Sequence, residues 1–217
     1  MRSLYLFSGF DKDRGFTPEI AKSLREHIVV KSSLVLISSC PDGYEKTDLY
    51  KDGITKWFFN IGIEFEHIAV LDDRKTEAEC IELVQNAAAI FLMGGTALLQ
   101  IEFLQKNNLI FALKGFNGVI MGMSAGAINM ATNSFYSADK DCGRTHIYKG
   151  IGLADVSIEP HFVIDNNALL DNDILPFSDI INIYAMCDDS AILICDNNRQ
   201  YYGNIYLVTK GKIEKIH

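Results

Sequence analysis

The segment Gly118-Val119-Ile120-Met121-Gly122-Met123-Ser124-Ala125-Gly126-Ala127 says most about the fold. An apolar run typical of a buried strand passes directly into G-M-S-A-G and then into small residues that favour the start of a helix. Such a turn holds a serine with its hydroxyl exposed at the carboxyl edge of a sheet, and the flanking glycines avoid a steric clash there. The segment therefore predicts an α/β fold with Ser124 as a candidate nucleophile.

The chain before this segment alternates short apolar runs with longer amphipathic stretches. The predicted strands are residues 3–8, 33–38, 63–71, 88–93 and 118–123, and the predicted helices lie near 18–28, 44–60, 75–86 and 97–113. This alternation is typical of a mostly parallel sheet with helices on both faces. The runs are nearly continuously apolar, as expected for strands that are buried on both sides.

The last third of the chain has a different pattern. A predicted helix near 167–181 is followed by strand candidates at 183–186, 191–195 and 204–209. Polar residues 196–200 are predicted to form a hairpin turn between the last two strands, and residues 210–212 a second tight turn. No linker, repeat or low-complexity tract interrupts the sequence, so we expect residues 1–217 to form a single domain.

Composition narrows the class of protein. The 217 residues carry 20 basic and 28 acidic side chains, a net charge of −8, which argues against binding to nucleic acid or to an anionic membrane. The five cysteines are scattered without a C-x-x-C spacing, so neither a disulfide framework nor a zinc site is expected. The apolar start of the chain is too short for a signal-peptide core, and the apolar run 87–93 is too short to span a bilayer. We therefore expect a soluble cytoplasmic protein.

Two backbone positions are candidates for an oxyanion hole. Gly94 and Gly95 follow the predicted strand 88–93, and parallel strands end at the same edge of a sheet. A flexible Gly-Gly turn there can present an N–H group toward Ser124. The N–H group of Ala125, at the predicted helix start, is the second candidate donor.

The candidate general base is a histidine in an extended segment. His161 lies in Glu159-Pro160-His161-Phe162, where the proline stiffens the chain and can hold an imidazole against a hydroxyl. His146, in a polar stretch, is the competing histidine.

The residues alone leave the acid open among three aspartates. Asp188 and Asp189 follow the predicted strand 183–186, and Asp139 lies 15 residues after Ser124. We expect Asp188 to lie nearer His161 than Asp139 does, because a residue that follows a strand reaches the edge where ligands bind.

These motifs together resemble a known family. The strand followed by G-x-S-A-G-A, the upstream Gly-Gly-Thr and the P-H-F segment resemble the peptidase E (aspartyl dipeptidase) family of serine peptidases, which includes cyanophycinase-like enzymes. The separation of 37 residues between Ser124 and His161 is similar to that of peptidase E. The resemblance implies a flavodoxin-like sheet related to class I glutamine amidotransferases, with serine in place of cysteine at the turn.

The resemblance also implies roles for individual residues. Ser124 is implied as the nucleophile, His161 as the base, and Gly95 with Ala125 as the oxyanion-hole pair. The glutamate that serves as the family's acid falls on Asp188, one methylene shorter, and Asp139 matches an aspartate that has also been proposed for the family. The order Ser, His, Asp along the chain differs from that of α/β-hydrolases, in which the histidine comes last.

The predicted function is that of a serine-type hydrolase that cleaves dipeptides or small peptides through an acyl-enzyme on Ser124. No metal and no organic cofactor is expected. The alternatives are a non-catalytic ligand-binding protein on the same scaffold, and an amidase or esterase of non-peptide acyl substrates.

The expected specificity departs from that of peptidase E. That enzyme carries an arginine downstream of its histidine to pair with an acidic substrate, whereas residues 162–188 of this chain contain aspartates but no lysine or arginine. We therefore expect no preference for acidic residues, unless Arg144 or Lys149 supplies the cation.

Overall fold

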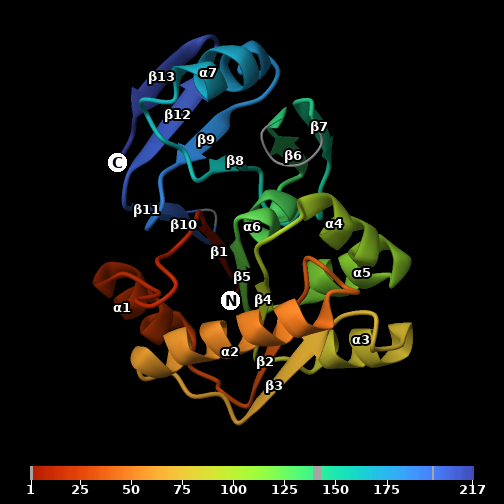
Figure 1. Cartoon of the computed structure of the whole chain (residues 1–217). Helices are drawn as coiled ribbons and strands as arrows, with labels where there is room; N and C mark the ends of the chain where they lie inside the picture. Colours follow the sequence, from red (N-terminus) through yellow and green to blue (C-terminus); the bar gives the residue numbers. More distant parts are fainter. Residues whose placement is uncertain (1, 139–142, 197) are drawn as a thin grey trace.

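The computed structural model, which describes residues 2–138, 143–196 and 198–217, is built around a seven-stranded sheet (Figure 1). The strand order is β11-β10-β1-β5-β4-β2-β3. The strands are β1 (Ser3–Phe7), β2 (Ser33–Ile37), β3 (His67–Leu71), β4 (Ala89–Leu92), β5 (Val119–Met123), β10 (Ala191–Cys195) and β11 (Asn198–Tyr202). The strands β1 to β5 are parallel, and β10 and β11 add an antiparallel hairpin beside β1.

Helices cover both faces of this sheet. They are α1 (Pro18–His27), α2 (Tyr44–Asn60), α3 (Glu77–Gln85), α4 (Ala97–Lys106), α5 (Leu109–Gly115) and α6 (Ala125–Met130). Successive strand residues point to opposite faces. Phe7, Leu36 and Phe91 pack against α1 and α2, whereas their neighbours Leu6 and Leu92 belong to the core under α3 to α6. The predicted α/β, flavodoxin-like class is therefore confirmed.

A second, four-stranded sheet lies above the first in Figure 1 and was not anticipated. Its order is β13-β12-β9-β8, with β8 (Ser157–Pro160), β9 (Ile183–Met186), β12 (Ile205–Thr209) and β13 (Lys212–Lys215). A separate hairpin pairs β6 (Asn133–Tyr136) with β7 (His146–Lys149). The strands β8 and β9 are parallel neighbours, so their carboxyl ends lie side by side.

The predicted hairpin turn at 196–200 is wrong. Residues 198–202 form β11, which pairs with β10 so that Cys195 lies opposite Asn198, while β12 pairs with β9 in the other sheet. Polar side chains are common on an edge strand such as β11, because they discourage pairing with other chains. The predicted turn at Lys210 and Gly211 is confirmed, because Thr209 pairs with Lys212 across it.

Two predicted helices and one strand have different bounds. The helix predicted over 97–113 ends at Lys106 and restarts at Leu109, because Asn108 adopts a left-handed conformation with φ 53°. The helix predicted over 167–181 has only one short α-helical segment, α7 (Asn167–Leu169). It continues as π and 3-10 turns and ends after Pro176, which lacks the N–H that a longer helix requires. The strand predicted from residue 63 begins at His67.

Candidate active site

Ser124 occupies the turn between β5 and α6. Its backbone φ of 48° and ψ of −110° are unusual for a residue with a side chain, and its N–H group lies 3.0 Å from the Phe7 carbonyl oxygen. A Cβ at Gly122 would lie 2.7 Å from the Ala127 nitrogen, and one at Gly126 would overlap the backbone of β4. The two glycines of G-M-S-A-G are therefore required by the close packing of the turn.

His161 and Asp188 come from the second sheet. They follow β8 and β9, and the Phe162 N–H group donates to the Met186 carbonyl oxygen at 2.9 Å, which holds the two strand ends together. The Nε2 atom of His161 lies 3.0 Å from Ser124 Oγ, and its Nδ1 atom lies 2.7 Å from Asp188 Oδ1. The structure thus brings Ser124, His161 and Asp188 into one hydrogen-bonded chain.

The turn after β1 supplies two residues that the sequence analysis missed. The Ser8 hydroxyl accepts a hydrogen bond from the His161 N–H group at 2.8 Å and donates to the Met186 carbonyl oxygen at 2.9 Å. Gly9 leaves room for the imidazole, since a Cβ there would lie 2.5 Å from His161 Cε1 and 2.6 Å from Asp188 Oδ1. Their position in the sequence could have indicated this role, because Ser8 and Gly9 follow a parallel strand and so lie at the same edge of the sheet as Gly94.

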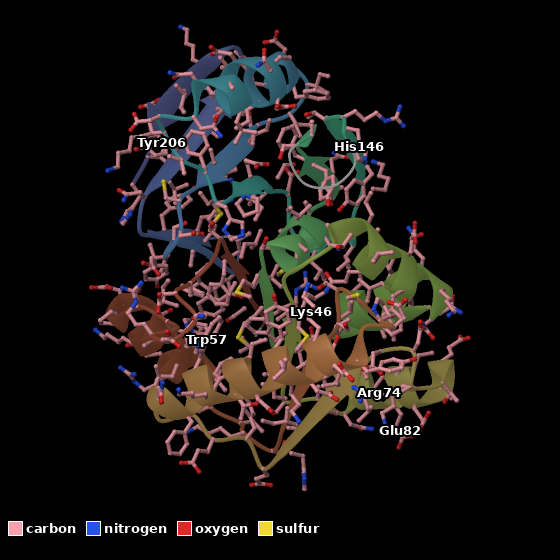
Figure 2. All side chains as sticks on the ribbon, in the orientation of Figure 1. Lys46, Trp57, Arg74, Glu82, His146 and Tyr206 are labelled. Carbon is pink, nitrogen blue, oxygen red and sulfur yellow. The ribbon has the colours of Figure 1, made fainter. Side chains whose placement is uncertain are left out.

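The other candidate side chains have different surroundings. Asp189, next to Asp188, forms an ion pair with Arg14, which raises the pKa of that guanidinium. His146 lies on β7 (Figure 2). Its ring packs against Tyr136 at 5.7 Å between centroids. Asp139, the alternative acid, lies outside the described residues.

One candidate oxyanion donor, Ala125, follows Ser124 directly in the chain, and the other, Gly95, lies in the turn after β4. Gly94 follows β4, and a Cβ built on it would lie 3.6 Å from Ser124 Cβ. Gly95 has φ 136°, and a side chain there would overlap the Ser39 hydroxyl, which donates to the Gly94 carbonyl oxygen. Ala125 is the first residue of α6, and the first N–H groups of a helix have no partner within it.

The site is open to solvent. The side chains of His161 and Asp188 are 48% and 61% exposed, so water and a peptide have access to the hydrogen-bonded chain. Burial and the neighbouring Asp188 charge raise the pKa of the Cys187 thiol. This thiol is therefore held in its protonated form at neutral pH and is a poor nucleophile.

The described ranges show no group of three His, Cys, Asp or Glu side chains placed to hold a metal ion. They also contain no helix that is both long and apolar enough to cross a membrane.

The model of one protein family, peptidase family S51, matches residues 13–201 of this sequence. The chain belongs to this family. It is therefore a serine-type peptidase, a hydrolase, and the resemblance to peptidase E is confirmed. No curated protein sequence matches the chain.

Solved structures show the same fold at low sequence identity. A peptidase from an acI-B1 Actinobacterium is 19% identical, with a TM-score of 0.69, over 100% of this chain and 94% of that chain. A putative peptidase E protein from Listeria monocytogenes EGD-e is 18% identical, with a TM-score of 0.64, over 93% of this chain and 98% of that chain.

Proposed function

We propose that this chain hydrolyses dipeptides or small peptides through an acyl-enzyme on Ser124, with His161 as the general base and Asp188 as its orienting acid. The observation that carries the proposal is the hydrogen-bonded chain from Ser124 Oγ through the imidazole to the carboxylate, at 3.0 and 2.7 Å. The positive φ of Ser124 adds support, since strained backbone clusters at active sites.

In the proposed first step the Ser124 oxygen attacks the peptide carbonyl carbon while its proton passes to His161 Nε2. Asp188 accepts a hydrogen bond from the Nδ1–H group, which selects this tautomer and stabilises the imidazolium. The backbone N–H groups of Gly95 and Ala125 stabilise the negative oxygen of the tetrahedral intermediate.

Collapse of the intermediate breaks the carbon–nitrogen bond, and the imidazolium gives its proton to the leaving amine. In the second half-reaction His161 takes a proton from water, whose oxygen attacks the ester carbon. The Ser124 oxygen leaves and recovers a proton from the imidazolium. These residues supply the nucleophile, the proton transfers and the charge stabilisation that peptide hydrolysis requires.

A cytoplasmic location and the absence of nucleic-acid partners belong to this proposal as predictions from composition.

Kinetics of single variants test the assignment. Ser124→Ala and His161→Gln are each expected to lower kcat for a small peptide by about 10⁴-fold or more, because members of such a triad act as a unit. Thermal unfolding and circular dichroism check that each variant is folded. Wild-type turnover by folded Ser124→Ala would contradict the proposed role of this serine.

A further inference from the structure

A hollow of about 450 Å³ lies beside the site, between α2 and the loop that joins β1 to α1. Met123, which precedes Ser124, and Phe10, which follows Gly9, both line it. Gly9 lies directly against the His161 ring. The hollow is therefore lined by the chain neighbours of Ser124 and of Gly9, and its volume is within the range of small-ligand sites.

The wall of this hollow is apolar and held in place. Tyr50, Gly53 and Trp57 line it at spacings of three and four residues, so they share one face of α2. The Trp57 indole N–H donates to the Lys12 carbonyl oxygen at 2.9 Å, and its ring packs edge-on against Phe10 at 6.0 Å between centroids. These contacts tie α2 to the loop and form the pocket before any substrate binds.

The hollow is deeper at Gly53, because this residue has no side chain. A Cβ at this position would meet no atom within 4 Å, although the residue lies in the interior of α2. The absence of a side chain here leaves space that is open to a substrate.

Lys46 connects this hollow to the turn after β4. It lines both the hollow and a narrower cavity at Gly94 and Gly95, and its Nζ atom lies 5.8 Å from the centroid of the Tyr50 ring (Figure 2 labels Lys46 and Trp57 on α2). Within the described part of the chain no carboxylate lies within ion-pair distance of this ammonium group. Among the described residues, the charged ones that line the hollow are two lysines, Lys12 and Lys46. Their positive charge favours an anion beside them.

We propose that this hollow is the subsite for an apolar side chain next to the scissile bond, and that Lys46 pairs with the C-terminal carboxylate of the same short peptide. The inference rests on the proposed function. An acidic side chain is disfavoured inside the hollow, because it would lose water among aromatic rings. The substrate class is thus a dipeptide with a leucine- or phenylalanine-like residue.

A dipeptide panel tests the apolar subsite. Each of Gly, Ala, Leu, Phe, Asp and Lys is placed as X in X-Ala and in Ala-X, and kcat/KM is measured for the wild-type protein. We expect Leu or Phe to exceed Gly by about 10- to 100-fold in one of the two positions. Equal rates, or the highest rates on Asp, would overturn the inference.

Gly53→Leu fills the hollow and tests where this preference arises. The variant is expected to lower the ratio of kcat/KM for the Leu or Phe peptide to that for the Ala peptide by at least about tenfold. Gly115→Leu is the matched control, because a Cβ at Gly115 also meets open space. Gly115 lines a separate hollow of about 640 Å³ with Ala88 and Gly118, at the amino edge of the sheet. An unchanged ratio in folded Gly53→Leu would refute this location.

Lys46→Met tests the charge at the mouth. In the wild-type protein the free-acid peptide is expected to have a kcat/KM about fivefold above that of its C-terminal amide, as for a partly exposed ion pair. The difference is expected to disappear in Lys46→Met and to persist in Lys56→Met, a control on the same helix whose side chain does not line the hollow. Persistence of the difference in Lys46→Met would refute the role of Lys46.

Labelling distinguishes failure of the proposed subsite from failure of the proposed function. If a serine-directed fluorophosphonate did not label wild-type Ser124, the proposed function itself would fail. If labelling and hydrolysis occurred without an apolar preference, only the subsite would be wrong.

Discussion

Ser124 adopts a backbone conformation that costs about 1–3 kcal/mol for a residue with a side chain. Its N–H group lies within hydrogen-bonding distance of the carbonyl oxygens of Phe7 and Ser8, so the strand next to β5 holds the turn in place. This strained conformation places the Ser124 hydroxyl 3.0 Å from His161 Nε2.

Gly9 leaves the space that the His161 imidazole occupies. Gly9→Ala would place a methyl group 2.5 Å from His161 Cε1 and 2.6 Å from Asp188 Oδ1, so the ring or the carboxylate must move. We expect kcat to fall by about 100-fold, as for a displacement of about 1 Å in a catalytic group. Steady-state kinetics measure the effect, with Gly115→Ala as the control, because a Cβ at Gly115 also meets open space and lies outside the site and the proposed subsite. Wild-type kcat in Gly9→Ala would show that the ring does not need its present position.

Asp188 stands where the resemblance to peptidase E implies a glutamate, so we test the charge and the length of its side chain separately. Asp188→Asn is expected to lower kcat by about 10³- to 10⁴-fold, because the amide favours the wrong histidine tautomer. Asp188→Glu keeps the charge and is expected to retain much more activity than Asp188→Asn. The kcat values of the two variants, measured at neutral pH, decide the point. Equal losses would mean that the carboxylate charge is not what matters.

At the scale of single elements, α2 contains one glycine in its interior and one just after its end. Gly53→Ala is expected to raise the free energy of unfolding by about 0.5–1 kcal/mol, because alanine is the better helix former and the Cβ meets nothing. Gly62, with φ 75°, follows the helix, and Gly62→Ala is expected to be destabilising. Chemical denaturation measures both, and the opposite pair of signs would contradict this account of α2.

The sequence predicts elements well where the signal is local. The turn at Ser124 follows from a buried strand, two glycines and a helix start, and Asp188 follows from its position after an apolar run. The second sheet was missed because β8 and β13 were not predicted as strands, and because β9 and β12 pair with each other although β10 lies between them in the chain. Ser8 was missed because its role depends on a strand that lies more than 150 residues away in the chain.

At the scale of the whole molecule, the site joins the two sheets. Ser124 follows a strand of the larger sheet, whereas His161 and Asp188 follow strands of the smaller one. The hydroxyl of Ser8, fully buried, links them through its bonds to the His161 N–H group and the Met186 carbonyl oxygen. We propose on this ground that residues 1–217 unfold as one domain.

Ser8→Ala tests this link between the sheets. Removal of the hydroxyl leaves the His161 N–H group without its acceptor and takes one of two donors from the buried Met186 carbonyl oxygen, which keeps its bond from Phe162. We therefore expect a loss of about 1–3 kcal/mol in the free energy of unfolding. A lower kcat is expected as well, since His161 loses one of the bonds that position its backbone. Urea denaturation and kinetics provide the two readouts. Unchanged stability together with unchanged kcat would mean that the hydroxyl does not couple the sheets.

The central claim, that Ser124 is an activated nucleophile, is tested most directly by covalent labelling. The wild-type protein is treated with a fluorophosphonate, digested, and mapped by tandem mass spectrometry. The account predicts one adduct on Ser124 that is absent from Ser124→Ala and strongly reduced in His161→Gln. An unlabelled Ser124 in folded wild-type protein, or an adduct on another residue that persists in Ser124→Ala, would contradict it.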